Sequence, residues 1–424
     1  MIKILKQDYL KRDEVFSDSV SHDVADTVAS IISDVRCRGD EALYEYTERF
    51  DKCKLDHLLV NQCEIDAAFA EIDDEFVSII KEAAKNIRTF HEKQVKQGYI
   101  QTSEDGAVCG QRVIPLERVG LYVPGGTAAY PSTVLMDSIP AKVAGCQEIV
   151  IVTPPGRDGK VPAPILVAAS IAGVDKIFKV GGAQAVAALA FGTQSIPRVD
   201  KIAGPGNMFV AEAKRQVYGR VDIDMIAGPS EILLIADKNT DPSILAADLL
   251  SQAEHDKNAT AVLVTDSSEL ADSVSLELER QIDNLPRKEI ARTSIDNNGL
   301  IIVCSDIDKA IDIANEIAPE HLEICLDEPF SYLGKIKNAG SVFLGRFCPE
   351  ALGDYFAGPN HTLPTSGTAR FSSPLSVDDF VKKSQYIYYT DSALENVYKK
   401  VAAFAEKEGL SAHARSARAR FEKI

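Results

Sequence analysis

The sequence lacks several features that would place it in other classes of protein. Its 424 residues contain no apolar run near the roughly 20 residues of a membrane-spanning helix, and Met1–Asp13 has no signal-peptide core. A formal net charge of −17 leaves no basic face for nucleic acid. We therefore expect neither a membrane nor a nucleic-acid partner.

The eight cysteines form no C-x-x-C pair. Scattered thiols in a chain of this size favour a reducing cytoplasm over a disulfide framework or a thiolate zinc site. Cys109 and Cys146 lie in the half of the chain that carries the glycine turns and could attack an aldehyde. Neither has a neighbouring histidine in sequence to lower its pKa, so inert buried thiols are the better interpretation.

Complete nucleotide-binding fingerprints are also absent. Two glycine turns, Gly181-Gly182-Ala183-Gln184 and Gly204-Pro205-Gly206-Asn207, each follow a predicted strand, but neither completes G-x-G-x-x-G and no G-x-x-x-x-G-K-[ST] occurs. Backbone N–H groups at such turns can hold a pyrophosphate. The turns are thus compatible with a dinucleotide bound in a non-standard way, or with ordinary strand-to-helix connections.

The composition, with 45% hydrophobic and 26% charged residues, is that of a soluble globular protein, and the chain is long enough for two or three domains. Residues 13–96 have a mostly helical pattern, and short β-prone runs follow at 113–115 and 119–123. Strand and helix patterns then alternate, which predicts parallel sheets. The expected strands are 148–152, 176–180, 201–203, 232–236, 260–264, 300–303, 322–325 and 341–344. A loop is expected over 345–374 and two or three helices over 376–424.

One predicted helix ends in a pair of possible metal ligands. Asp241 is a good N-cap, Pro242 suits the first helical position, and apolar residues recur at helical spacing up to Leu250. Gln252 and His255 then project from the same side. The pair could form half of a zinc site or could be plain polar surface.

Four of the seven histidines stand beside a carboxylate or in a Gly/Pro loop: His255, His321, His361 and His413. Pro319-Glu320-His321 lies where a helix must stop and a strand begin, so the imidazole could remove a proton from an alcohol and Glu320 could activate water. Asp354, in Gly353-Asp354-Tyr355, could join Gln252 and His255 around a metal or could stabilise its own turn.

Read together, these segments resemble the histidinol dehydrogenase family nearly from end to end. The resemblance is carried by the following motifs: Glu117-Arg118-Val119-Gly120-Leu121-Tyr122-Val123-Pro124-Gly125-Gly126, Gly181-Gly182-Ala183-Gln184-Ala185, Gly204-Pro205-Gly206-Asn207, Ile223-Asp224-Met225-Ile226-Ala227-Gly228-Pro229-Ser230-Glu231, Gln252 with His255, Ala318-Pro319-Glu320-His321-Leu322-Glu323, Gly358-Pro359-Asn360-His361-Thr362, and Glu408 with His413.

The resemblance implies a cytoplasmic homodimer of α/β subunits. Each subunit would hold two incomplete Rossmann-like domains with parallel sheets, plus small helical N- and C-terminal elements. The expected division is a helical element over 1–18, a metal and catalytic domain over 19–122 and 231–374, an NAD-side domain over 123–230, and a C-terminal helical tail over 375–424 that reaches the partner subunit.

The resemblance also implies a reaction and a set of site residues. L-Histidinol would be oxidised to L-histidine through L-histidinaldehyde, the last two steps of histidine biosynthesis, with two NAD⁺, one water and one Zn²⁺ per subunit. Glu320 and His321 would be catalytic, with His321 as proton acceptor and Glu320 as activator of water. The zinc ligands would be Gln252, His255, Asp354 and His413, the last from the partner. Ser230, His321, His361, Glu408 and the four zinc ligands would contact the substrate, and Tyr122, Gln184 and Asn207 the NAD.

Three alternatives remain at this point. The nearest is a zinc- and NAD-dependent dehydrogenase for another small alcohol, although the loss of Glu408 or His361 that would favour it is not seen. A zinc hydrolase, with Glu320 activating metal-bound water, leaves both glycine turns unexplained. A non-catalytic binding protein would not need every proton-transfer and ligand candidate.

Overall fold

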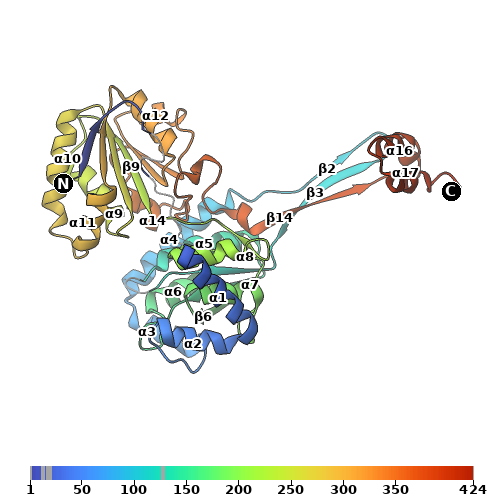
Figure 1. Cartoon of the computed structure of the whole chain (residues 1–424), viewed down its shortest axis with the longest axis horizontal. Coiled ribbons are helices and arrows are strands. Elements are labelled where there is room, and N and C mark those ends of the chain that lie inside the picture. Colours follow the sequence, from blue (N-terminus) through green and yellow to red (C-terminus); the bar gives the residue numbers. More distant parts are fainter. Residues whose placement is uncertain (1, 11–14, 16–21, 126–128, 424) are drawn as a thin grey trace. The chain divides into compact units, whose positions relative to one another are not determined.

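The computed structural model describes residues 2–10, 15, 22–125 and 129–423 (Figure 1). It separates into two compact units, the first comprising 1–94 and 116–380 and the second 95–115 and 381–424. The structure is mixed α/β with parallel sheets, which confirms the predicted fold class. Among the described residues, no helix is long and apolar enough to cross a membrane.

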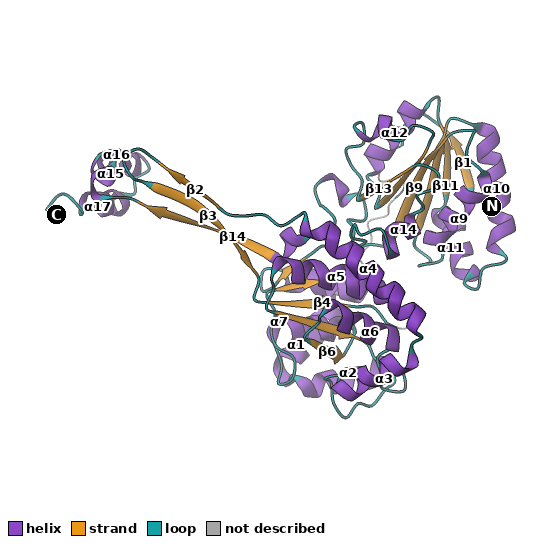
Figure 2. Ribbon diagram, turned by 180° about the vertical axis from the view of Figure 1, so that it is seen from behind, coloured by secondary structure: helices purple, strands orange, loops and turns teal. Residues whose placement is uncertain are grey.

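The first unit contains a six-stranded parallel sheet with helices on both faces (Figure 2). Its strands, in spatial order, are β1 (Lys3–Lys6), β11 (Leu300–Val303), β10 (Thr260–Thr265), β9 (Glu231–Ala236), β12 (His321–Cys325) and β13 (Ser341–Leu344). Strands β9, β10 and β12 are buried along their whole length, as their continuous apolar runs predict. One face is covered by α9 (Pro242–Ala253), α10 (Ser268–Ile282) and α11 (Lys288–Asn298), and the other by α12 (Ile307–Ile317).

The same unit contains a five-stranded parallel sheet. Its spatial order is β6 (Lys176–Lys179), β5 (Glu148–Thr153), β4 (Arg118–Tyr122), β7 (Lys201–Ala203) and β8 (Asp222–Ile223). Two buried clusters cover its faces, and they draw on α1 (His22–Arg38), α2 (Asp40–Phe50), α3 (Gln62–Glu71), α4 (Asp74–Glu92), α5 (Pro131–Ala144), α6 (Ala163–Ala172), α7 (Gly182–Phe191) and α8 (Met208–Val217).

The predicted strands of both sheets are confirmed, but the expected packing of residues 19–122 is wrong. That segment was expected to pack with 231–374. Instead β4 is the central strand of the five-stranded sheet, and α1 to α4 pack against its helices. The physical reason is that the apolar faces of α1 to α4 are buried in the clusters around this sheet.

The expected N-terminal helical element over 1–18 is wrong where the chain is described, because Lys3–Lys6 forms strand β1 beside β11. Four residues are too short for a stable helix, whereas they complete the edge of an existing sheet. Residues 1, 11–14 and 16–18 of that element, and Gly126 of the Gly125-Gly126 motif, lie outside the described residues.

The second unit is small. Strands β2 (Tyr99–Thr102), β3 (Val108–Pro115) and β14 (Val381–Tyr388) form an antiparallel sheet in the order β14-β3-β2. Helices α15 (Asp391–Glu395), α16 (Tyr398–Lys407) and α17 (Ser411–Arg418) follow. The tail is therefore helical as predicted only after β14, since that strand pairs along its whole length with β3.

The remaining short helices are α13 (Phe330–Leu333), α14 (Glu350–Tyr355) and two 3-10 turns, Thr368–Arg370 and Val377–Phe380. The last of these packs against α5, in the cluster on one face of the five-stranded sheet. The expected loop over 345–374 thus contains one helix, α14, which the Gly and Pro content of the segment concealed.

Candidate active site

His321 stands at the start of β12, where the sequence predicted a helix-to-strand junction. Helix α12 ends at Ile317, and Ala318 adopts a left-handed conformation with φ of 55° as its cap. Pro319 cannot continue the helix, and β12 begins at His321, in register with Ile232 of β9 and Ser341 of β13. The imidazole therefore lies at the amino end of a central, buried strand.

Hydrogen bonding fixes one nitrogen of His321 and leaves the other free. Nδ1 lies 2.9 Å from the carbonyl oxygen of Glu231, which can only accept, so Nδ1 carries the proton. Nε2 has no hydrogen-bond partner among the described residues, although the side chain is 4% exposed. Its neighbours are Glu350 Oε1 at 3.7 Å and Asp354 Oδ1 at 3.8 Å. Nε2 is thus the ring nitrogen that can exchange a proton with a bound substrate.

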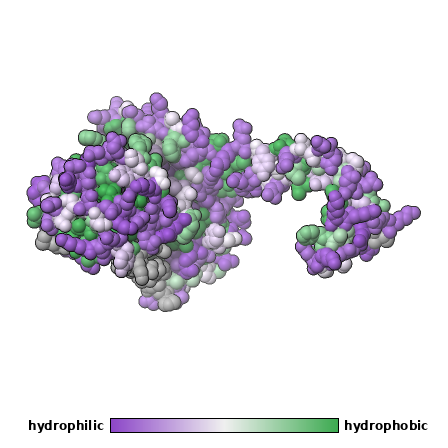
Figure 3. Space-filling view, turned by 90° about the horizontal axis from the view of Figure 1, so that it is seen from above, coloured by the Kyte–Doolittle hydropathy of each residue, from purple (hydrophilic) through white to green (hydrophobic). Residues whose placement is uncertain are grey.

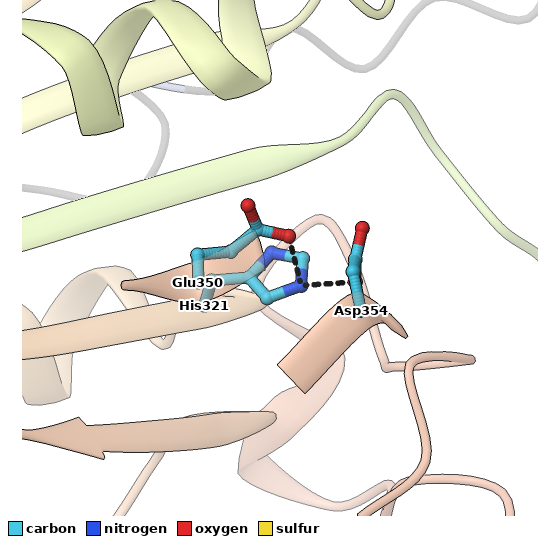
Figure 4. A group of neighbouring side chains, drawn as sticks. All are labelled: His321, Glu350 and Asp354. Atoms are coloured by element: carbon cyan, nitrogen blue, oxygen red, sulfur yellow. Dashed lines mark ion pairs between the residues drawn. The ribbon is translucent and has the colours of Figure 1, made fainter. Parts of the chain in front are cut away.

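Glu350 and Asp354 both come from α14 and flank the imidazole (Figure 4). The ligand atoms of His321, Glu350 and Asp354 lie within 4.8 Å of one another, close enough to hold one metal ion. Residues four apart lie on the same face of a helix, so the spacing of the two carboxylates could have revealed Glu350 from the sequence. Glu350 was not among the residues predicted from the sequence.

Glu320 is held by the first residue of β9. Its Oε2 accepts the backbone N–H of Glu231 at 2.8 Å and lies 3.7 Å from Nδ1 of His321. The Glu231 carboxylate in turn accepts the backbone N–H of Ser366. Glu231 was also missed, although a glutamate opening a strand of six buried residues is an unusual signal.

Burial and neighbouring charges shift the pKa values of these groups. Burial raises the pKa of Glu320 to about 7, against the opposing effect of His321. Burial raises the pKa of Glu231 to about 8, and the Glu320 charge adds to this. For His321, burial alone would lower the pKa, but the carboxylates of Glu320, Asp354 and Glu350 raise it to about 10. Perturbed groups gathered in this way are typical of active sites.

Asp354 stays ionised among three imidazoles. Burial would raise the pKa of its carboxyl, but the neighbouring His321 and His361 hold it below its usual range. His361 Nδ1 lies 3.8 Å from Asp354 Oδ1 and 3.1 Å from its backbone oxygen. Burial lowers the pKa of both His255 and His361, and the Asp354 charge opposes this in each case. Neutral imidazoles around an ionised carboxylate are a suitable donor set for zinc.

Gln252 lies in the last turn of α9 and His255 just beyond it. Asp241 caps this helix as predicted, since its side chain accepts the N–H of Ser243 at 2.8 Å. Gln252 is 1% exposed, yet neither its Oε1 nor its Nε2 has a partner among the described residues. A buried amide without partners costs free energy, which a bound ligand would recover. Asp354 and His321 are both close enough to His255 to influence its pKa.

A second set of predicted residues lies at the carboxyl edge of the five-stranded sheet. Tyr122 ends β4 and its hydroxyl accepts the N–H of Gly182 at 3.0 Å, while Gln184 lies in the first turn of α7 with its buried Oε1 unpaired among the described residues. Asn207 caps α8, its Oδ1 accepting the N–H groups of Phe209 and Val210 at 3.0 and 3.2 Å. Three strand ends therefore converge where nucleotides bind in parallel sheets.

The remaining predicted residues are placed as follows. Ser230 precedes β9, and its backbone oxygen accepts the N–H of Thr260 at 3.0 Å. Glu408 and His413 belong to the second unit, where both are exposed. The structure gathers His255, Glu320, His321, Asp354 and His361, whereas the roles predicted for Glu408 and His413 rest on the resemblance alone.

Comparisons with known proteins bear on this site. The family model described as "Histidinol dehydrogenase" matches residues 16–421. A histidinol dehydrogenase of Clostridium acetobutylicum is 58% identical over 400 residues, covering 94% of this chain and 93% of the relative. A histidinol dehydrogenase of Bacillus subtilis is 54% identical over 407 residues, covering 96% of this chain and 95% of the relative. The crystal structure of histidinol dehydrogenase from Elizabethkingia anophelis superposes with a TM-score of 0.93 at 39% identity, covering 99% of this chain and 98% of that one.

Proposed function

The chain belongs to the histidinol dehydrogenase family, and we propose that its His321 cluster oxidises L-histidinol to L-histidine with two NAD⁺ and one water. It is thus an oxidoreductase of histidine biosynthesis. The observation that carries the proposal is the buried His321, whose Nδ1 donates to Glu231 and whose Nε2 faces Glu350 and Asp354.

Our proposal assigns proton removal to His321. Each oxidation of a carbinol or of an aldehyde hydrate releases one hydroxyl proton, and the free Nε2 can accept it. The carbonyl of Glu231 keeps the imidazole in the tautomer that leaves Nε2 basic. The raised pKa of His321 comes from three carboxylates, and a cation bound at one of them would counter it.

Glu320 is proposed to activate the water that converts L-histidinaldehyde to its hydrate. Its pKa of about 7 suits a general base at neutral pH, and its hydrogen bond from Glu231 fixes its position. The hydrate then loses its proton to His321 in the second oxidation. Burial of both side chains keeps the reactive aldehyde away from bulk water.

The donor set fits zinc. We propose that Gln252, His255 and Asp354 hold it together with His413 of the partner subunit. The buried amide of Gln252, unpaired within the described ranges of the chain, and the ionised Asp354 support this set. Zn²⁺ when bound would hold and orient the imidazole and amino nitrogens of the substrate. Ser230, His361 and the partner's Glu408 would complete the contacts to L-histidinol.

The carboxyl edge of the five-stranded sheet fits NAD. We propose contacts from Tyr122, Gln184 and Asn207. They are supported by Oε1 of Gln184, which has no partner in the described part of the chain, and by the exposed N-terminus of α8. NAD⁺ when bound would accept two electrons and a hydrogen from the carbinol carbon in each oxidation. The residues of this chain would position the cofactor, and His321 would accept the hydroxyl proton.

The second unit supports a homodimer. Among the described residues, the buried apolar cluster of its helices consists of Ala402, Ala405 and Ala414 with Ala417 packed against it, which is too small for independent stability. Large apolar side chains are exposed on it, including Ile100 at 68%, Ile387 at 73% and Phe404 at 71% exposure. Apolar patches, coloured green, are visible on this unit in the space-filling view (Figure 3). We propose that a second copy of the chain covers them. All eight cysteines are free thiols, which supports a cytoplasmic enzyme.

The test is to count NADH formed per L-histidinol consumed, with and without a chelator. We expect two NADH per L-histidinol, loss of activity on chelation and recovery with zinc. No NADH from L-histidinol, but turnover of another alcohol, would assign the site to a related dehydrogenase. Metal-dependent hydrolysis without NAD binding would favour the hydrolase alternative.

A further inference from the structure

Asp137, a fully buried residue of α5, contacts both the glycine turn proposed for NAD and the segment that carries His361. Its Oδ1 accepts the hydroxyl hydrogen of Thr362 at 2.8 Å. Its Oδ2 lies about 3.1 Å from the point where a Cβ on Gly204 would sit, so the carboxyl rests against the turn itself. A single side chain therefore touches both halves of the proposed site.

The His361 segment is anchored on α5 by more than one bond. Thr362 donates its hydroxyl to Asp137, and its N–H donates to Asn360 Oδ1 at 2.8 Å. Asn360 Nδ2 in turn donates to the backbone oxygen of Met136 at 2.6 Å. Residues 360 and 362 are thus both fixed on α5, with His361 between them. A shift of α5 would carry His361 with it.

The glycine turn is clamped by a buried ion pair. Lys214 Nζ donates to the Gly204 oxygen at 2.9 Å, and Asp224 Oδ2 accepts the Gly204 N–H at 2.8 Å. Lys214 and Asp224 also pair with each other, with side chains 2% and 1% exposed. Gly204 has φ of 114°, and a Cβ there would lie 2.2 Å from the Tyr122 oxygen. The turn has little freedom to move without disturbing Asp137.

We propose that Asp137 and Thr362 are positioning residues that couple occupancy of the Gly204–Asn207 turn by the cofactor to substrate binding at His361. The proposal rests on the function proposed above. Its physical basis is that a close-packed, hydrogen-bonded interior transmits displacement, because every polar partner must move together. Coupling of this kind is reciprocal, so substrate must also tighten cofactor binding.

The experiment uses a ternary complex that cannot react, NADH with L-histidinol, on the full-length, zinc-loaded protein. The dissociation constant of NADH is measured by its fluorescence with and without saturating L-histidinol. We expect L-histidinol to tighten NADH binding at least about fivefold in the unaltered protein. Thr362→Val removes the hydroxyl but keeps the shape of the side chain, and should reduce this ratio below about twofold. Thr362→Ser keeps the hydroxyl and should retain the coupling.

A ratio near one in the unaltered protein, or an undiminished ratio in Thr362→Val, overturns the proposal. Circular dichroism and thermal melting verify folding, and Thr362→Ala replaces the valine variant if the latter does not fold. The outcome is separate from that of the proposed function. If the unaltered protein makes no NADH from L-histidinol, the proposed function is wrong. If it binds both NADH and L-histidinol but neither changes the affinity for the other, only the proposed coupling is wrong.

Discussion

The two nitrogens of His321 have different environments, and this difference leads to the first prediction. Asparagine cannot accept a proton, so His321→Asn should reduce NADH formation from L-histidinol by about 10²–10⁴-fold. Zinc content, measured by atomic absorption, should remain near one per subunit, since His321 is not among the proposed ligands. His57→Asn, at an exposed imidazole, is the control. Near-native turnover in His321→Asn would refute the assignment of the base.

Glu320 is expected to serve a different step from His321. Glu320→Gln keeps the size of the side chain but loses a base near neutrality, so oxidation of L-histidinaldehyde should slow more than oxidation of L-histidinol. The two half-reactions are followed separately by stopped-flow NADH formation. Equal slowing of both would contradict the division of labour.

Asp137 should make stability depend on pH. Burial raises its pKa from 3.8 to about 8 in the fold, opposed by the Thr362 hydrogen bond. A raised folded-state pKa gives stability that is complete below the unfolded-state value and is lost as pH rises through the folded-state value. Asp137→Asn cannot ionise, so its free energy of unfolding should rise relative to the unaltered protein between about pH 4 and 8. Denaturant titrations across this window measure the difference, and a constant difference would contradict the prediction.

Individual site residues were predictable where a local pattern marks them. Pro319-Glu320-His321 was predicted at a helix-to-strand junction, and the structure confirms that junction. Glu231 was not predicted because its contacts with Glu320 and His321 depend on the pairing between β9 and β12, although its place at the start of a buried strand is a local signal. The proximity of Asp137 to Thr362 joins positions 225 residues apart, and it follows only from the packed fold.

The turn between β7 and α8 depends on glycine in a way that can be measured. At Gly204 both the positive φ and the contact with Tyr122 exclude a Cβ, whereas Gly219 has φ of 91° but nothing within 4 Å of a Cβ. Gly219→Ala should therefore cost about 1–2 kcal/mol of backbone strain alone. Gly204→Ala should cost more and also weaken NADH binding, as thermal melting and fluorescence titration would record. Equal costs at the two glycines would show that the contact does not matter.

Strands were more predictable than the segments between them. The continuous apolar runs of β9, β10 and β12 identify buried parallel strands. Strand β1 has only four residues and depends on pairing with β11, and α14 is a short helix in a Gly- and Pro-rich segment. Both are stabilised by tertiary packing, which a local pattern does not report.

The residues proposed to bind the cofactor and those proposed to carry out the chemistry lie at opposite edges of their respective parallel sheets. The proposed cofactor residues follow the carboxyl ends of strands in the five-stranded sheet, as the general rule for parallel sheets expects. Glu231 and His321 instead open their strands, at the amino edge of the six-stranded sheet. The rule for parallel sheets therefore does not locate the His321 cluster, whereas the chemistry of the Glu320–His321 motif does.

The proposed homodimer makes a prediction that only two chains together can test. If His413 completes the partner's zinc site, His255→Asn and His413→Asn should each be inactive as homodimers. In a purified heterodimer of the two variants, one site carries both substitutions and the other carries neither, so about half of the native activity should return. Different affinity tags on the co-expressed chains isolate the heterodimer. If each site were built within one chain, both sites of the heterodimer would be defective and no activity would return. The experiment therefore separates a shared site from a dimer whose sites are independent.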